Sequence, residues 1–254
     1  MAEAEEFSGT QAAQSLGESL RRSALEWGAD FYGVANLTVA REAIVDQGGE
    51  MLAGFPRALS LGIAMPPYIV DQLPHQDDAR VAAAYRAHSY DILNRRLDGL
   101  ASRLNSVLQR EGFQTFPVPA SWRVSRERLL GHFSHKMAAH LAGLGWIGRS
   151  CLLITPEVGP RVRWATVLTD APLETGSPMP NGCGDCRACV DICPASAFSG
   201  RRFVANEPRS VRFDVFKCRA YQESITTPEG GGLCGMCVYV CPHGQKNRDA
   251  RLCE

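Results

Sequence analysis

The stretch CGDCRACVDICP, from Cys183 to Pro194, and the stretch CGMCVYVCP, from Cys234 to Pro242, decide how the C-terminal part of this chain folds. Each stretch contains cysteines separated by two residues. Each ends in a cysteine that lies three residues further on and is followed by proline. Such spacing lets a tight loop present its first sulfurs to one iron–sulfur cluster and its last sulfur to another. The sequence therefore predicts two 4Fe–4S clusters with crossed ligands.

The lone Cys218 completes the eight thiolates that two clusters require. Zinc is a poorer interpretation, because three cysteines spaced by two and a cysteine–proline exit are not a zinc-ribbon spacing. Disulfides require an oxidising compartment, and nothing in the sequence indicates secretion. The predicted ligands are Cys183, Cys186, Cys189 and Cys241 for one cluster, and Cys193, Cys218, Cys234 and Cys237 for the other.

Two further cysteines fall outside these sets. Cys151 lies in an apolar stretch and is expected to be a buried core residue, and Cys253 is expected to be inert.

The composition indicates a globular protein without a strong field of its own. The chain has 254 residues and a formal net charge of +0, so nucleic-acid binding is not expected. No apolar run approaches the roughly 20 residues that a membrane span needs. The acidic beginning lacks the basic-then-apolar order of an export signal. We therefore expect a cytoplasmic protein that does not associate with membranes.

The first two thirds of the chain alternate between helical and extended patterns, which predicts an α/β architecture. The composition then changes to a segment rich in Gly, Pro and Cys, where clusters rather than a packed core would organise the fold. We place the domain boundary between residues 171 and 172, giving domains 1–171 and 172–254. The expected helices are 11–29, 40–52, 80–110 and one containing Met137, and the expected strands are 30–37, 58–65, 113–119, 151–155 and 163–169.

The segment from Ala138 to Leu173 contains AGLGWIG at 142–148, LLITPEVGPRVR at 152–163 and LTDAPL at 168–173. Followed by two cysteine runs, it resembles the superfamily of epoxyqueuosine reductases and reductive dehalogenases. AGLGWIG is similar to the first group, and the other two stretches are more similar to the second.

The resemblance implies a nitroreductase-like α/β domain of the cobalamin-binding type, followed by an α+β ferredoxin-like domain with two 4Fe–4S clusters. It implies an oxidoreductase that passes electrons through the clusters to a cobalamin-type cofactor, which reduces an organic substrate. The residues it implies for cofactor binding are Gly143, Leu144, Gly145, Trp146 and Gly148. Without the resemblance, the same glycines fit a helix C-cap and a tight turn equally well.

The chain also departs from the family. Counting back from AGLGWIG, Leu129 occupies the position at which epoxyqueuosine reductases carry a general-acid Asp, and leucine cannot donate a proton. Glu127 or His132 are the candidate replacements. The catalytic Tyr of the dehalogenases has no assigned position here. We expect a short relative whose partners are an electron donor such as ferredoxin or flavodoxin, and a small-molecule substrate or corrinoid.

Two other classes of function remain open. One is a two-cluster electron-transfer protein, and the other is a corrinoid-activating reductase without a substrate of its own. Among other polar residues, His132, His135 and His140 are expected to be ordinary histidines unless one acts as an acid or a cobalt-side contact. Tyr221 is expected to pack beside a cluster. The basic loop containing Trp122, Arg123, Arg126 and Arg128 is more consistent with a solvated segment than with an anion site.

Overall fold

The computed structural model describes the backbone of residues 2–125, 127–227 and 230–245, and the side chains of 14–125, 127–226 and 232–245. Arg126 and Cys253 lie outside the described residues. The chain divides into two compact units. The first consists of residues 1–63, 94–144 and 164–178, and the second of 64–93, 145–163 and 179–254.

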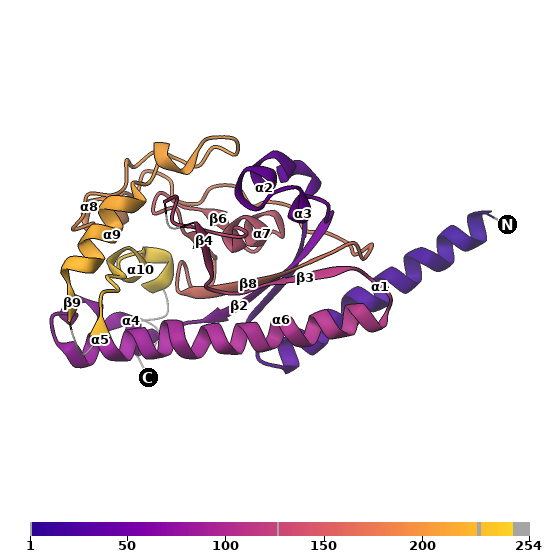
Figure 1. The fold of residues 1–254 in the computed structure, drawn as a ribbon, viewed down its shortest axis with the longest axis horizontal. Helices are drawn as coiled ribbons and strands as arrows, with labels where there is room; N and C mark the ends of the chain where they lie inside the picture. The colour runs from indigo at the N-terminus through magenta and orange to yellow at the C-terminus, as the bar shows by residue number, and fades with distance from the viewer. Residues whose placement is uncertain (1, 126, 228–229, 246–254) are drawn as a thin grey trace. The chain divides into compact units, whose positions relative to one another are not determined.

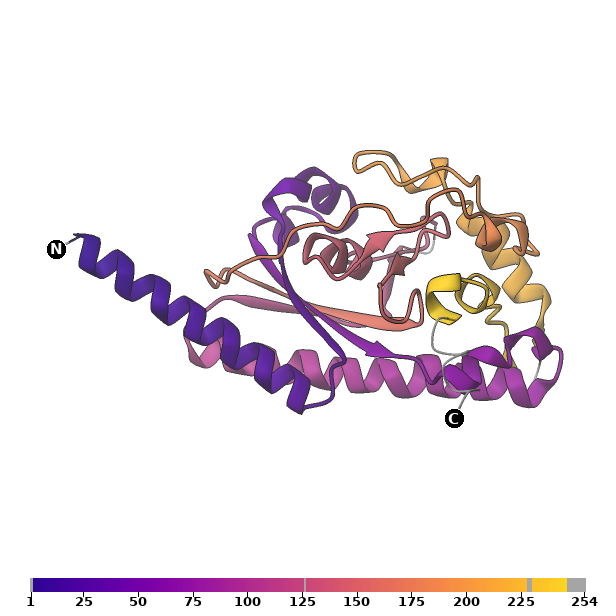
Figure 2. The ribbon, with the colours of Figure 1, turned by 180° about the vertical axis from the view of Figure 1, so that it is seen from behind.

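The first unit is built around a four-stranded sheet with the strand order β1-β2-β8-β3. β1 (Phe31–Asn36) pairs antiparallel with β2 (Arg57–Ala64), and β3 (Thr115–Val118) pairs antiparallel with β8 (Val162–Thr169). Both ribbon views show α1 and α6 on one side of the sheet and α2, α3 and α7 on the other (Figures 1 and 2). These helices span α1 (Ala2–Glu26), α2 (Arg41–Gly48), α3 (Glu50–Ala53), α6 (Leu93–Arg110) and α7 (His135–Leu141). The predicted α/β architecture is confirmed.

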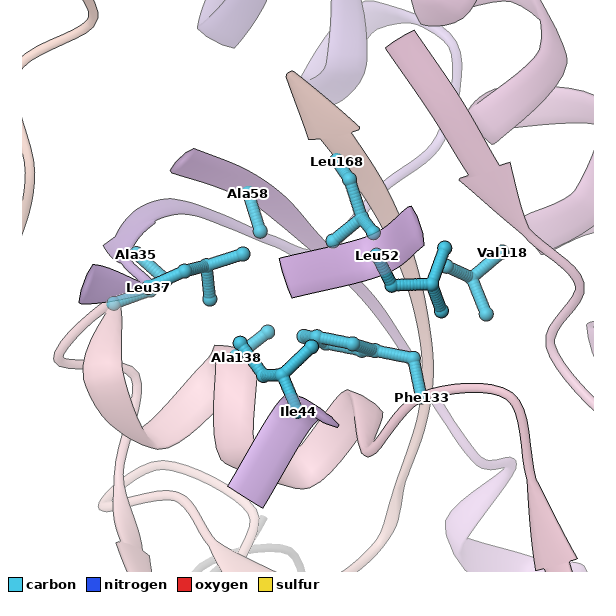
Figure 3. Packing of buried hydrophobic residues seen from close by; sticks show 10 residues of the cluster. Ala35, Leu37, Ile44, Leu52, Ala58, Val118, Phe133, Ala138 and Leu168 are labelled. Carbon is cyan, nitrogen blue, oxygen red and sulfur yellow. The ribbon is translucent and has the colours of Figure 1, made fainter. Parts of the chain in front are cut away.

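Apolar packing holds the α2–α3–α7 side of this sheet. Figure 3 shows Ile44 from α2, Leu52 from α3 and Ala138 from α7 meeting Leu168 of β8, together with Phe133. Leu52 and Ala138 are completely buried. At about 25 cal/mol per Å² of apolar surface removed from water, burial of this cluster stabilises the unit.

The long amphipathic helix is present with one interruption. The leucine stripe predicted for 80–110 is buried along α6. The helix before it, α5 (Ala79–Arg86), is joined to α6 by a π-helical segment, η3 (Ala87–Ile92). A π-turn inserts an extra residue into the helical ladder and is frequent at functional sites. The buried stripe consists of Leu93, Leu97, Leu100, Leu104 and Leu108.

The second unit contains mainly short elements. Within residues 174–226 and 232–245, Ala197 and Val238 are the only buried hydrophobic residues. Segments 64–93 and 145–163 belong to the same compact unit as this region. The domain division at 171/172 stays a prediction. The other elements of the second unit are α4 (Pro67–Asp71), η2 (Leu73–His75), the paired strands β6 (Trp146–Ile147) and β7 (Leu153–Ile154), α8 (Ala188–Asp191), η4 (Arg209–Val211), α9 (Val215–Ser224), β9 (Thr226–Thr227), β10 (Gly230–Gly231) and α10 (Met236–Tyr239).

The remaining described elements of the first unit are η1 (Thr38–Ala40) and the hairpin strands β4 (Arg123–Ser125) and β5 (Leu130–Gly131). The extended stretch expected at 151–155 shortens to β7, because Cys151 adopts a positive φ of 55°. Cys151 is 3% exposed, which confirms its prediction as a core residue. Within the described residues, every helix falls short of what a bilayer span requires.

Candidate functional site

The first predicted cysteine set lines a single cavity. Cys183, Cys186, Cys189 and Cys241 all face a space of about 120 Å³ in the second unit. The first three belong to one stretch and Cys241 to the other, so the chain brings the two ends of the crossed set together. Cys186 is exposed and the other three are half-buried.

The second predicted set also converges, around Cys218 on α9 and Cys237 on α10. Burial and then the nearby Cys193 and Cys234 raise the pKa of Cys218 to about 11. Burial and then Cys234 and Cys218 raise the pKa of Cys237. Such mutual effects act only between groups that lie close together. The four thiols therefore form a second cluster of potential ligands.

The two sets adjoin each other. Cys189 of the first set also raises the pKa of Cys237 of the second, after burial and the nearer thiols. Cys193 follows Cys189 directly through the end of α8 but belongs to the other set. One short helical turn therefore connects the two groups of sulfurs.

Local backbone geometry aims these sulfurs. The amide of Cys186 donates to the carbonyl of Cys183 at 3.0 Å, which closes the first loop. In the second stretch, Gly235 has a φ of 68° and precedes α10. This left-handed conformation is inexpensive for glycine and strained for other residues.

Side-chain donors surround the sulfurs. The indole Nε1 of Trp146 donates to Cys183 Sγ at 3.4 Å. The amide Nε2 of Gln222 donates to Cys218 Sγ at 3.5 Å, one turn along α9. Donors of this kind favour negatively charged sulfur.

Arg149 anchors the loop of the first set. Its guanidinium donates to the carbonyl of Gly200 and, at 2.9 Å, to the carbonyl of Gly184. Arg149 and His243 line the same cavity as the four cysteines. Because a guanidinium remains charged at any ordinary pH, Arg149 brings a positive charge beside sulfurs that must be anionic to bind metal.

The donor set fits iron–sulfur clusters. Burial and then Cys183, Cys241 and Cys186 raise the pKa of Cys189 to about 11, so without metal the thiol is favoured over the thiolate. Bound iron would supply the missing positive charge. Among the described residues, no three His, Cys, Asp or Glu side chains converge tightly enough for a single metal ion. Four thiols spread around one cavity suit a larger, polynuclear centre.

The glycines of AGLGWIG are accounted for by the packing of the chain itself. Gly143 has a φ of 75°, and its amide donates to the carbonyl of His140 while that of Leu144 donates to Ala139, which is a Schellman C-cap of α7. A Cβ on Gly143 would lie 2.6 Å from the carbonyl oxygen of Ser177. The turn therefore requires glycine without any ligand.

The rest of this segment follows the same pattern. A Cβ on Gly145 would lie 2.2 Å from the Ile154 carbonyl oxygen, and one on Gly148 would lie 2.8 Å from the Ile154 side chain. Leu144 packs against Gly33 of β1, and Trp146 is 6% exposed beside Cys183. Corrinoid binding by these residues stays a prediction.

A second cavity, of about 220 Å³, lies in the first unit. Both Leu129 and His132 line it, and Leu129 has a φ of 48°. A non-glycine residue in this region carries local strain, which is common near functional sites. Glu127 is exposed, and its carboxylate accepts from Ser125 Oγ at 3.3 Å rather than lining the cavity. Of the two candidate acids, the structure therefore brings only His132 to this cavity.

The other histidines differ from His132. His135 lines the cavity, but its Nε2 contacts the Pro119 carbonyl at 3.1 Å and its Nδ1 contacts Thr166 Oγ1 at 2.8 Å. The carbonyl can only accept, so Nε2 carries the proton. Both nitrogens of His135 are thus engaged in structural contacts. His140 is half-buried near the end of α7.

The basic loop is partly neutralised. Arg128 forms an ion pair with Asp46 at 2.5 Å, whereas Trp122 and Arg123 line the second cavity. Tyr221 lies beside the second cysteine set, since burial and then Cys234 and Cys193 raise its pKa.

Sequence reasoning missed several neighbours of the cysteines. Arg149 and His243 line the cavity of the first set, and a Cβ on Gly235 in the second stretch would lie 2.9 Å from Tyr85 Oη. None of these three residues carried a motif that linked it to the thiols. The adjacency of Arg149 to AGLGWIG and of His243 to the cysteine–proline exit was the only available signal.

The cysteine-bearing segment matches a described protein family. Residues 182–244 match a family model described as a 4Fe-4S double cluster binding domain. The tetrachloroethene reductive dehalogenase of Sulfurospirillum multivorans is 38% identical over 119 residues, covering 42% of this chain and 23% of that protein. The epoxyqueuosine reductase of Gloeobacter violaceus is 36% identical over 124 residues, covering 44% of this chain and 36% of that protein. That of Synechococcus sp. (strain CC9605) is 28% identical over 263 residues, covering 91% and 77%.

Solved structures show the same fold. An epoxyqueuosine reductase from Streptococcus thermophilus matches with a TM-score of 0.56 at 20% identity, over 89% of this chain and 65% of that one. A reductive dehalogenase, described with a mechanism for B12-dependent dehalogenation, matches with a TM-score of 0.65 at 21% identity, over 93% and 33%. The chain spans well under half the length of the first two curated relatives, 23% and 36%.

Proposed function

Because this chain is a relative of the epoxyqueuosine reductases and reductive dehalogenases, we propose that it is an iron–sulfur oxidoreductase. Electrons would pass through two 4Fe–4S clusters to a cobalamin-type cofactor that reduces an organic substrate. The observation that carries the proposal is the convergence of Cys183, Cys186, Cys189 and Cys241, from two distant stretches, on one cavity. In this proposal residues 1–171 form a nitroreductase-like domain and residues 172–254 form a ferredoxin-like domain.

The chain's own residues have defined tasks in this function. The two cysteine sets hold the clusters, which carry one electron at a time when bound. The proximity of Cys189 and Cys237 supports electron transfer between the sets. Trp146 and Gln222 donate to ligand sulfurs and favour their anionic form. His132 is the side chain that would deliver a proton to a substrate in the second cavity.

The substrate belongs to the class of reducible organic molecules. The two groups of relatives act, by their names, on epoxyqueuosine and on tetrachloroethene. Electrons would come from a small carrier protein such as ferredoxin or flavodoxin.

Anaerobic purification with metal analysis tests the proposal. We expect about eight iron atoms per chain and, after incubation with cobalamin, about one equivalent bound. The control is Cys151→Ala, which removes a buried thiol outside both sets and should keep the iron content. About eight iron atoms per chain without any bound cobalamin would overturn the cobalamin-dependent function.

Leu129 favours a second candidate function. An apolar side chain lines the second cavity where epoxyqueuosine reductases would carry an acid, and Glu127 does not line it. The alternative is a two-cluster electron-transfer protein or a corrinoid-activating reductase. Mixing the reduced protein with a separate corrinoid protein identifies the activating reductase. That function alone predicts electron transfer to the corrinoid without turnover of a substrate.

A further inference from the structure

Tyr85 on α5 has a buried hydroxyl without a hydrogen-bond partner. The residue is 1% exposed, and its Oη finds no donor or acceptor among the described residues. Leaving a buried hydroxyl unsatisfied costs about 1–3 kcal/mol. Such a group calls for a partner, and an acceptor that belongs to a bound group would satisfy it.

The hydroxyl lies against the second cysteine stretch. A Cβ on Gly235 would be 2.9 Å from Tyr85 Oη and 2.8 Å from the side chain of Leu73. Gly235 and Met236 are the two residues between Cys234 and Cys237. Tyr85 therefore closes over the loop that carries two of the predicted ligands.

Neighbouring rings hold the tyrosine in place. Tyr90 contacts Tyr85 edge-on, with ring centroids 5.9 Å apart and an interplanar angle of 79°. Arg163 stacks over Tyr90 at 4.3 Å. A ring fixed in this way loses little further entropy when its hydroxyl forms a bond, which makes it suitable as a preorganised donor.

The electrostatics agree with this proximity. Burial raises the pKa of Tyr85 well above its usual value, with further contributions from Tyr90, Cys237 and Cys234, while Arg163 lowers it. Tyr85 thus remains protonated at any ordinary pH, and its hydroxyl stays available as a donor.

We propose that Tyr85 is a positioning residue that donates an O–H···S hydrogen bond to the cluster held by Cys193, Cys218, Cys234 and Cys237, and so raises its reduction potential. The acceptor is a ligand thiolate or a cluster sulfide. The proposal rests on the proposed function only in requiring a cluster in this set, and it requires neither cobalamin nor a substrate.

The direction of the effect follows from charge. Reduction adds one electron, and a hydrogen bond to sulfur stabilises the more negative state. Removing the donor should therefore make reduction of this cluster harder. The other cluster has its own donor, Trp146 to Cys183, which the change leaves in place.

The experiment compares two tyrosine variants in the iron-loaded protein. Tyr85→Phe removes the proposed donor. Tyr32→Phe is the matched control, because Tyr32 in β1 also has a buried hydroxyl without a partner among the described residues. Burial and Arg21, rather than any cysteine, determine the shift of its pKa. Redox titration followed by electron paramagnetic resonance measures both cluster potentials. We expect Tyr85→Phe to shift one cluster to a more negative potential and leave the other unchanged, while Tyr32→Phe shifts neither.

A second variant should shift the reduction potential of the same cluster in the opposite direction. Placing 3-fluorotyrosine at position 85 keeps the ring and makes the hydroxyl a stronger donor, so the same cluster should shift to a more positive potential. Unchanged potentials in both position-85 variants would overturn the proposal, as would an equal shift in the Tyr32 control. Wild-type protein that holds iron in the Cys183 set alone would overturn the proposal together with the two-cluster function. Two clusters without cobalamin would overturn the cobalamin-dependent function alone.

Discussion

The sheet of the first unit and the cysteine-bearing segment of the second achieve order by different means. The sheet contributes Ala35, Ala58, Val118 and Leu168 to an apolar cluster that it shares with α2, α3 and α7. The described part of the cysteine segment, 174–226 and 232–245, buries only Ala197 and Val238 among its hydrophobic residues. A segment with so little core gains its stability from other contacts. In this segment the eight thiols are the groups that could supply them, as ligands of bound metal.

This difference has an energetic consequence. Apolar burial stabilises the sheet whether or not a metal is bound. Metal ligation contributes directly to folding where the ligands converge only in the folded state, as they do when residues from two distant stretches share one site. The two regions should therefore respond in opposite ways to metal removal and to core mutation.

Iron removal should produce the largest effect. After anaerobic chelation, we expect residues 174–245 to lose protection against proteolysis and hydrogen exchange, because uncompensated thiols replace the clusters. The sheet should keep its protection, since its core contains no ligand. Hydrogen exchange followed by mass spectrometry measures both regions in one sample. Equal protection of the cysteine segment with and without iron would contradict the metal dependence.

Crossed ligation is tested by pairs of substitutions. Replacing Cys183 and Cys241 together by Ala should remove one cluster and leave about four irons, because both residues line one cavity. Replacing Cys183 and Cys234 together should remove both clusters. Iron analysis and electron paramagnetic resonance distinguish the two outcomes. Ligation within each stretch, without crossing, would instead make Cys183→Ala with Cys241→Ala lose both clusters.

The spacing of the cysteines predicted more of the site than any other feature. Ligand spacing is a local property of the sequence, and the proline after Cys193 and after Cys241 marks the cysteine that leaves its own loop. Helical periodicity likewise predicted α6, because a leucine stripe depends only on neighbours three or four positions away. The α/β alternation followed from the same local patterns.

Long-range contacts could not be predicted from local sequence patterns. Tyr85 meets Gly235, and Arg149 meets Gly200, through tertiary packing that no local pattern encodes. The membership of 64–93 in the second unit has the same origin. The glycines of AGLGWIG illustrate a different limit, since a pattern that resembles a cofactor site also satisfies a Schellman cap and close backbone packing.

A core mutation in the sheet unit should have a smaller but distinct effect. Leu52→Ala removes a completely buried side chain and should lower the free energy of unfolding of the first unit by about 2–5 kcal/mol. Iron content should stay at the wild-type level. The control is Met51→Ala on the same helix, where the side chain is 62% exposed. Thermal unfolding monitored by circular dichroism gives the comparison, and a loss of iron in Leu52→Ala would show that the two regions are coupled.

The smallest expected effect concerns the cap of α9, where the two modes of stabilisation meet. The carboxylate of Asp214 accepts from the amides of Phe216 and Lys217, both at 3.0 Å, and α9 carries Cys218. Asp214→Ala should cost about 1 kcal/mol of helix stability and increase the rate of iron loss from the second set alone. Asp214→Asn preserves a good cap and is the matched control. Iron release to a chelator, followed by absorbance, measures the rates. Equal release from Asp214→Ala and Asp214→Asn would mean that α9 is held by the cluster through Cys218 rather than the reverse.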